Sequence, residues 1–344
     1  MAEKNPNSLQ NQSYSINNKH IAKPSSEFYA VFSQQEIINL IEALKIRREI
    51  PLKYSYKGAG ANIWDNFYRK LIVPNWYRSN VEINLLKDNF EYLNGKTENC
   101  YKVNIIDVGA GNSYPVKEYI RKLDKLGKIN RYTALDISEE LLNLSKRNFT
   151  KWFPFIKYTN SYIDIENNPI PEYLLHQDSI NIFLHLGVTI GNLLHRVKAL
   201  KNFKQSMGKN DLLVLTNEIG NNSEWDGIAR GGCYYHAEQI YQRINKNIGI
   251  QHQDCELIRK YDEKTDSVVA NLKFTSDYTI DFSDTGINQK VVICKDEEIT
   301  IWRHHKHQLP ELIQELEQAG LQLIHHSTNK YQSHIMAICK IKCN

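Results

Sequence analysis

The segment that most constrains the fold runs from Val103 to Ser113 and reads V-N-I-I-D-V-G-A-G-N-S. Its apolar, β-favouring start leads into Asp107 and then into a turn with Gly109 and Gly111, and a helical pattern follows from Val116. Glycines at such a turn let backbone N–H groups approach a ligand closely, because no Cβ stands in the way. The segment therefore predicts a strand–turn–helix unit that binds a ligand at its turn.

A second strand adds an acidic residue where ribose hydroxyls need one. The short β-like run from Tyr132 to Leu135 ends in Asp136 and is followed by a helix start at Ser138. An acidic residue at the end of the second strand of a βαβ unit is placed to accept hydrogen bonds from ribose hydroxyls. The presence of Asp136 therefore disfavours the alternative that the glycine turn binds no ligand. The dinucleotide fingerprint G-x-G-x-x-G is incomplete, because Tyr114 replaces its third glycine. This departure favours adenosylmethionine, which has no pyrophosphate, over NAD.

Strand-like and helix-like segments alternate from about Tyr101 to Leu215. The most apolar of them, S-I-N-I-F-L-H-L at Ser179–Leu186, is typical of a buried central strand in a parallel sheet. This alternation predicts a doubly wound parallel sheet, which binds ligands outside the carboxyl ends of its strands. The residues that fall at such ends are Asp107, Gly109, Asp136, Asp164 and Asn192.

The chain is predicted to form an α/β core with a second, α+β subdomain. The first helix is expected behind Ser33, with Glu36 at the capping-box position, and the alternating rhythm breaks after Asn217. The predicted parts are a flexible polar tail (1–25), N-terminal helices of a substrate-covering subdomain (26–98), the cofactor-binding core (99–216), an insertion that completes the subdomain (217–303) and the closing part of the core sheet (304–344).

Composition excludes several classes of partner. A net charge of +4 over 344 residues, without a basic stripe, argues against nucleic acid, and no apolar run is long enough to cross a membrane. The six cysteines contain no C-x-x-C pair, which suits a reducing cytoplasm. The run Arg303–His307 has histidines that alternate across a strand, so we expect no metal. A monomer or weak dimer is expected.

The sequence resembles the histidine-specific methyltransferase family, known from the ergothioneine pathway, which includes fungal enzymes that N-methylate a prenylated tryptophan. The resemblance rests on K-Y-S-Y-x-x-x-G at Lys53–Gly60, on the D-V-G-A-G-N-S turn and, most specifically, on G-V-T-I-G-N-L at Gly187–Leu193. It implies a Rossmann-like class I methyltransferase sheet, S-adenosylmethionine as cofactor and N-methylation of a small-molecule amine.

The resemblance also implies roles for single residues. Asn192 matches the asparagine that holds the substrate's amine and carboxylate end. Tyr77 matches a substrate-pocket tyrosine, and Tyr234 matches a tyrosine that contacts the substrate carboxylate. Asn192 could serve as a helix N-cap as well. With the glycine turn included, the predicted cofactor contacts are Tyr56, Asp107, Gly109, Gly111, Ser113, Asp136, Tyr162 and Asp164.

The chain departs from the family pattern at the substrate end. The histidine enzymes hold the imidazole with a glutamate and a serine in a strand R-T-E-V-S, and here Trp302 and His304 fall at those positions. Losing a buried hydrogen-bond partner costs a factor of ~10² or more in discrimination, so an aromatic or indole-like amine is favoured over histidine. The predicted substrate contacts are Tyr77, Asn192, Tyr234, Trp302 and His304.

Methyl transfer requires a neutral amine placed about 3 Å from the methyl carbon, opposite sulfur. Aromatic walls and Asn192 disfavour the ammonium form, so a dedicated general base is not required, although His304 or Tyr234 could serve. The expected function is N-methylation in a secondary-metabolite or alkaloid pathway. The alternatives are a histidine Nα-methyltransferase, a methyltransferase acting on protein or nucleic acid, and a relative without activity.

Overall fold

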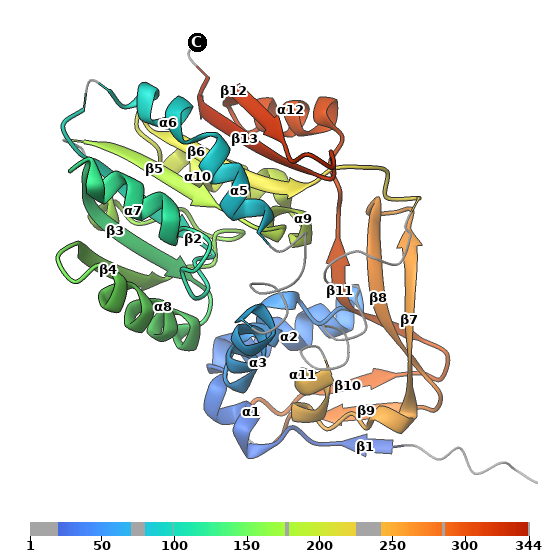
Figure 1. Cartoon of the computed structure of the whole chain (residues 1–344). Helices are drawn as coiled ribbons and strands as arrows, with labels where there is room; N and C mark the ends of the chain where they lie inside the picture. Colours follow the sequence, from blue (N-terminus) through green and yellow to red (C-terminus); the bar gives the residue numbers. More distant parts are fainter. Residues whose placement is uncertain are drawn as a thin grey trace, which may run out of the picture.

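A seven-stranded sheet with the order β12-β13-β6-β5-β2-β3-β4 forms one half of the protein (Figure 1). The computed structural model describes residues 20–69, 80–98, 100–175, 179–224, 242–283 and 286–342. Strands β2 to β6 run parallel, and β13 is antiparallel to both β6 and β12. The strands are β2 (Val103–Val108), β3 (Ile129–Asp136), β4 (Lys157–Tyr162), β5 (Ile180–His185), β6 (Leu212–Glu218), β12 (Leu321–Thr328) and β13 (His334–Ile341).

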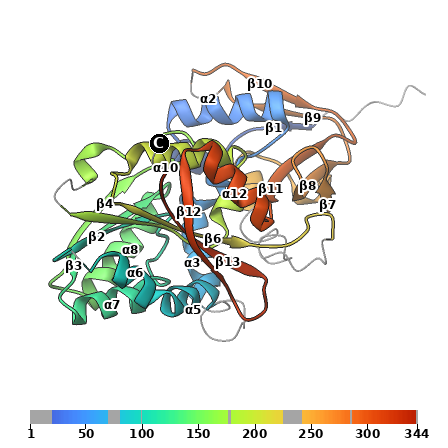
Figure 2. The same ribbon diagram turned by 90° about the horizontal axis from the view of Figure 1, so that it is seen from above.

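Helices cover both faces of this sheet (Figures 1 and 2). Strand side chains alternate between the faces, so that Ile182 and Leu184 of β5 enter one core and Phe183 enters the other. The Rossmann-like sheet predicted from the alternating pattern is therefore confirmed. One face carries α5 (Val81–Asp88), α6 (Phe90–Lys96), α7 (Lys117–Lys125) and α8 (Glu139–Trp152), and the other carries α10 (Arg196–Ser206) and α12 (Leu309–Gln318).

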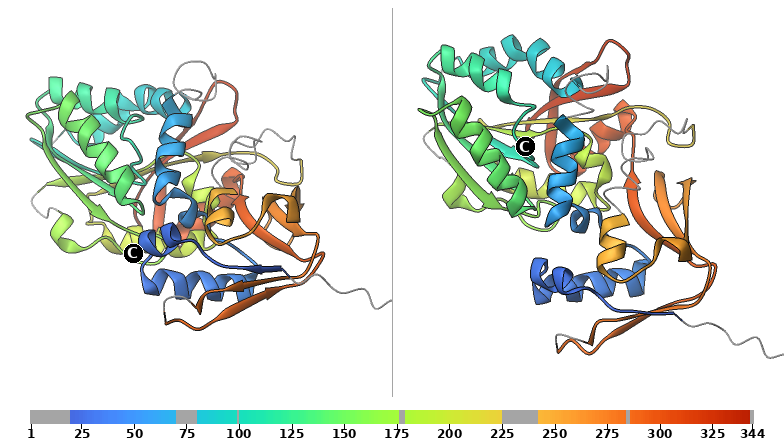
Figure 3. Two further views of the ribbon diagram at one scale, coloured as in Figure 1. Left: turned by 90° about the horizontal axis from the view of Figure 1, so that it is seen from below. Right: turned by 60° about the horizontal axis from the view of Figure 1, so that its bottom comes forward.

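The other half is an α+β subdomain (Figure 3). Its buried apolar side chains form one core. Its two sheets have the orders β11-β8-β7 and β1-β9-β10, and the N-terminal helices share their core. These elements are β1 (His20–Ala22), α1 (Ser26–Val31), α2 (Gln34–Glu42), α11 (Gln242–Asn247), β7 (Cys255–Asp262), β8 (Ser267–Phe274), β9 (Tyr278–Asp281), β10 (Lys290–Ile293) and β11 (Glu298–His304).

Two boundaries differ from the predicted ones. Strand β1 lies within the predicted flexible tail, where it pairs in parallel with β9. Helices α5 and α6 were expected in the substrate subdomain, but Val81, Leu85 and Phe90 pack into the core of the large sheet. Their apolar spacing predicted helices without indicating which core those helices would join, because either core offers a similar apolar surface.

Local signals in the sequence explain where several helices begin. Ser33 and Glu36 form the expected capping box, in which Ser33 N–H donates to Glu36 Oε2 at 3.0 Å. Ser138 caps α8 by accepting a hydrogen bond from the backbone of Leu141 at 3.3 Å. Among the described residues, no helix has the length and apolar character needed to cross a bilayer.

Helix α3 (Ala59–Phe67) joins the two halves. Its Ala61 packs against Leu141 and Leu144 of α8, and its Asp65 accepts a hydrogen bond from Asn112 at 2.8 Å. Asn112 belongs to the turn after β2, so α3 brings the second subdomain directly against that turn. The site described next lies at this junction.

Candidate active site

A cavity of about 340 Å³ lies at the carboxyl ends of the parallel strands, next to α3. This volume is in the range of about 300–1,000 Å³ that is typical of small-molecule sites. Parallel sheets place their ligands at such ends, so the position agrees with the prediction from the sequence. The predicted residues that line the cavity are Tyr56, Gly109, Gly111, Asp136, Asp164 and Asn192.

The turn after β2 forms the floor of this cavity. Gly109 and Gly111 have φ angles of +76° and +53°, a left-handed conformation that side chains with a Cβ rarely adopt. A Cβ on Gly111 would also lie 2.7 Å from Cη2 of Trp64, another cavity residue. The absence of a side chain at Gly111 therefore lets the indole of Trp64 pack directly against the turn at the edge of the cavity.

Asp136 holds this turn from the end of β3. Its Oδ2 accepts a hydrogen bond from Gly111 N–H at 2.9 Å, and its Oδ1 accepts one from Ser138 N–H at 3.1 Å. Burial raises the pKa of Asp136 to about 6, although hydrogen bonds from the backbone of Gly111, Ser138 and Ile137 lower it. Asp136 lines the cavity, and its carboxylate oxygens can accept further hydrogen bonds from ribose hydroxyls there.

The raised pKa of Asp136 predicts a pH-dependent affinity for S-adenosylhomocysteine. Ribose hydroxyls bind the ionised carboxylate more strongly, so binding lowers the pKa of this group and protonation opposes binding. The affinity should be constant above about pH 7 and fall below pH 6, approaching tenfold per pH unit. Titration calorimetry from pH 5 to 8 measures this. Asp136→Asn should give weaker but pH-independent binding, and an unchanged slope in that variant would contradict the assignment.

Asp107 and Ser113 lie behind the turn rather than in the cavity wall. Tyr132 donates a hydrogen bond to Asp107 Oδ2 at 2.6 Å, and its hydroxyl is 2.7 Å from Ser113 Oγ. Burial raises the pKa of Asp107 to about 7, although the Tyr132 hydrogen bond lowers it. Both residues were predicted as cofactor contacts, and the structure instead places them in a buried hydroxyl chain that supports the turn.

Asp164, which follows the end of β4, contributes a carboxylate to the cavity wall. Lys53 donates to Asp164 Oδ2 at 2.8 Å, and both residues line the cavity. Tyr162 was also predicted as a cofactor contact, but it is 41% exposed and does not line this cavity. Its hydroxyl donates to Glu36 at 3.3 Å and its ring lies under the ammonium of Lys57, so it contacts the N-terminal helices.

The predicted substrate residues separate into two layers. Asn192 lines the cavity, whereas His304 is buried behind it, with Nδ1 3.1 Å from Asn192 Oδ1. Trp302 is only 2% exposed, belongs to the core of the second subdomain and stacks on His304 with ring centroids 6.0 Å apart. Neither Trp302 nor His304 lines the cavity. Tyr77 and Tyr234 lie outside the described residues.

Asn192 is not a helix N-cap. It is the last residue of α9 (Thr189–Asn192), and His195 occupies the position before α10. The cap interpretation was wrong because the strand is followed by a short helical turn of its own. The amide of Asn192 is therefore not engaged by a helix terminus.

His185 is a cavity residue that reasoning from the sequence missed. Its Nδ1 is 2.9 Å from the carbonyl of Val108, and burial lowers the pKa of its imidazole to about 4. The ring is therefore neutral at pH 7 with Nδ1–H donating, which leaves Nε2 as an acceptor without a partner among the described residues. The available signal was a histidine at the end of an otherwise apolar strand. Further cavity residues that received no role from the sequence include Arg47, Glu49, Lys53 and Trp64.

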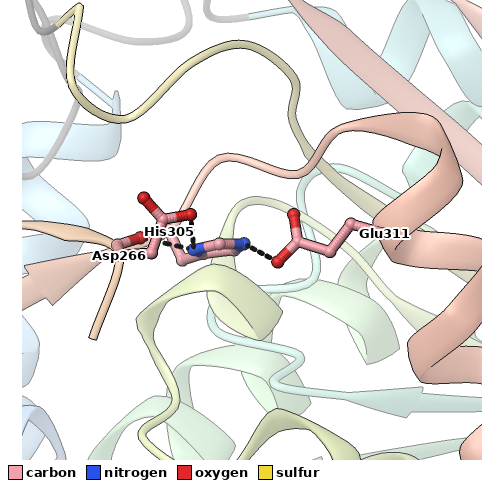
Figure 4. A group of neighbouring side chains, drawn as sticks. All are labelled: Asp266, His305 and Glu311. Atoms are coloured by element: carbon pink, nitrogen blue, oxygen red, sulfur yellow. Dashed lines mark hydrogen bonds and ion pairs between the residues drawn. The ribbon is translucent and has the colours of Figure 1, made fainter. Parts of the chain in front are cut away.

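Asp266, His305 and Glu311 form a group of side chains of metal-ligand type, shown in Figure 4. None of the three lines the cavity. His305 Nε2 is 2.8 Å from Glu311 Oε1, and its Nδ1 is 2.6 Å from the backbone oxygen of Asp266 and 3.7 Å from Oδ2 of the same residue. The two carboxylates thus face opposite nitrogens of one ring, whose lone pairs point in different directions. This geometry fits a structural role, in which His305 links Asp266 of the insertion to Glu311 of α12. It does not direct the three side chains toward one shared metal ion.

The geometry above agrees with the family comparison. The family described as histidine-specific, SAM-dependent methyltransferases matches residues 33–341. The chain belongs to this family. It is an S-adenosylmethionine-dependent methyltransferase, and the resemblance read from its motifs is confirmed. The residues present fit this cofactor, because the close-approach turn and the Asp136 carboxylate supply donors and acceptors for its nucleoside part.

Individual relatives are distant. Ergothioneine biosynthesis protein 1 of Neurospora crassa is 26% identical over 223 residues, which cover 63% of this chain and 23% of that protein. A non-reducing polyketide synthase of Aspergillus terreus is 28% identical over 115 residues, 32% of this chain and 4% of that protein. The chain thus spans about a quarter or less of these curated relatives. A solved S-adenosylmethionine-dependent methyltransferase from Clostridium acetobutylicum is similar with a TM-score of 0.47 and 12% identity, covering 82% of this chain and 99% of that one.

Proposed function

We propose that this methyltransferase transfers the methyl group to the amine of a small aromatic or indole-like compound derived from an amino acid, in secondary metabolism. The observation that carries the proposal is the replacement of the imidazole-holding glutamate of the family pattern by Trp302, which is 2% exposed. Trp302 lies in the core of the second subdomain and does not line the cavity, so the position of the family glutamate offers no carboxylate to an imidazole N–H. The cavity is therefore proposed to select an amine attached to an apolar ring.

Histidine Nα-methylation is the second candidate, and two observations favour it. One is the description of the family itself. The other is Glu49, whose carboxylate lines the cavity. However, Glu49 Oε2 already lies 3.1 Å from Arg303 Nη2 and 3.6 Å from Arg47 Nε. The two guanidinium groups compete with an imidazole for this carboxylate and offset its charge, so the aromatic amine remains the first proposal.

The proposed mechanism needs mainly placement. The bound sulfonium supplies a methyl group that is already activated for displacement. The chain must hold the amine lone pair about 3 Å from that methyl carbon and keep the amine neutral. The carboxylates of the wall already accept hydrogen bonds or form ion pairs within the protein. The apolar residues of the wall disfavour an ammonium ion, and Asn192 and the neutral His185 offer polar contacts without adding charge. No dedicated general base is required.

Sequential calorimetry tests the proposal. S-adenosylhomocysteine is titrated first, and then histidine, tryptophan and tyramine are titrated separately into the binary complex. We expect binding of the cofactor product, heat from at least one aromatic amine and none from histidine. Binding of histidine alone would replace the first proposal by the second. A chain that does not bind S-adenosylhomocysteine would contradict both.

A further inference from the structure

Behind Asn192 lies a buried carboxylate between two histidines. Glu218, the last residue of β6, has Oε2 3.4 Å from Nε2 of His304 and Oε1 3.6 Å from Nε2 of His334. The three residues come from β6, β11 and β13, and each is at most 5% exposed. Both imidazoles therefore direct the same nitrogen toward one carboxylate.

This arrangement selects a tautomer of His304. A carboxylate has a lower ordinary pKa than an imidazole, so it accepts a proton rather than donating one. Of the two tautomers of an imidazole, the contact favours the one with its hydrogen on the facing nitrogen, which is Nε2 of His304, 3.4 Å from the carboxylate oxygen. His304 Nδ1 then has a lone pair and can act only as an acceptor.

The tautomer of His304 in turn selects the orientation of the Asn192 amide. The amide atom drawn 3.1 Å from His304 Nδ1 is Asn192 Oδ1, but the oxygen and nitrogen of an amide have the same shape, so a half-turn of the amide places Nδ2 there instead. An acceptor at Nδ1 requires the amide nitrogen at that position. We propose that Glu218 and His304 are positioning residues that turn the carbonyl oxygen of Asn192 into the cavity.

The orientation matters for methyl transfer, and this step rests on the proposed function. An amide carbonyl accepts a hydrogen from the amine and leaves the nitrogen lone pair free to attack. The opposite orientation would present an N–H donor, which would bind the lone pair that must attack the methyl group. Glu218 and His304 thus adapt the cavity to an uncharged amine with at least one N–H.

The packing around Asn192 keeps this chain of contacts in place. His305 N–H donates to the carbonyl of Gly191 at 2.8 Å, and Asn217 donates to the carbonyl of His305 at 2.9 Å. The end of β11 is thereby tied to α9 on one side and to β6 on the other. His304 has no room to rotate away from Glu218, because it is 1% exposed.

Nitrogen NMR of the S-adenosylhomocysteine complex tests the inference without a substrate. Long-range ¹H–¹⁵N spectra, assigned by comparison with His304→Gln, should show a hydrogen on Nε2 of His304 and none on Nδ1. Glu218→Gln should remove this preference. The matched control is Glu315→Gln, another buried carboxylate next to a histidine, His307 at 3.1 Å, and it should leave His304 unchanged. A hydrogen on Nδ1 in the unmodified protein would overturn the inference.

A double-mutant cycle tests the consequence for the amine that binds in the calorimetric series. Glu218→Gln should weaken amine binding about 10–100-fold and leave S-adenosylhomocysteine binding within about twofold. In an Asn192→Asp background either carboxylate oxygen is an acceptor, whichever way the side chain is turned. Glu218→Gln should therefore reduce the amine affinity of this variant by less than about threefold. An equal loss in both backgrounds would overturn the inference. If no amine binds, the proposed function is contradicted. The NMR measurement of the His304 tautomer needs no amine and still tests the present inference.

Discussion

Asp136→Ala is expected to weaken S-adenosylhomocysteine binding by about 10²–10³-fold. The carboxylate lies at the cavity wall and is already oriented by backbone N–H groups of Gly111 and Ser138, so it is preorganised to accept two ribose hydroxyls. Hydrogen bonds to a charged group are worth about 1.5–3 kcal/mol each, and about 3–4 kcal/mol corresponds to this loss of affinity. Calorimetry at pH 8 measures it, because the carboxylate is then ionised.

Two further variants separate ribose binding from support of the turn. Asp136→Asn keeps one acceptor oxygen, so its affinity for S-adenosylhomocysteine should lie between those of the unmodified protein and Asp136→Ala. Asp124→Ala removes an exposed carboxylate from α7 and should bind with unchanged affinity. Asp136→Ala with unchanged affinity would show that this residue only supports the turn, and the ribose would have to be placed elsewhere in the cavity.

The parallel sheet and the cofactor end of the cavity could be predicted from local sequence. An apolar run that ends in an acid or a glycine turn marks a strand end, and parallel strands bring their ends to one edge. Gly109, Gly111, Asp136 and Asn192 therefore come together for a reason that can be read from residues close in the chain. No distant contact had to be known.

The substrate end could not be predicted in the same way, because it depends on register and on packing between distant segments. The pairing of β11 with β8 shifts by one residue between Thr300 and Trp302, which changes the face that the following side chains occupy. Beyond this shift, His304 is buried behind Asn192 and Trp302 lies in the core of the second subdomain, so neither side chain lines the cavity. Tyr162 contacts the N-terminal helix that carries Glu36, 126 residues away, and no local pattern reports such a contact.

Gly191→Ala is expected to have the second large effect, on both the fold and the amine site. A Cβ at this position would lie 2.4 Å from the carbonyl oxygen of His305 and 2.8 Å from Asn217 Oδ1 and His304 Cε1. The first neighbour is backbone and cannot rotate away, so α9 would have to move. Overpacking of this kind costs about 1–3 kcal/mol, and thermal unfolding should show a melting temperature lowered by several degrees.

The displacement should affect the two ends of the cavity unequally. Asn192 follows Gly191 directly and would move with α9, so amine binding to the S-adenosylhomocysteine complex should fall at least about tenfold. The turn after β2 and Asp136 are held by separate hydrogen bonds, so cofactor affinity should change by less than about threefold. Gly95→Ala is the matched control, because nothing lies within 4 Å of its added Cβ. Equal losses of amine and cofactor affinity would show that α9 supports the whole cavity rather than its amine end.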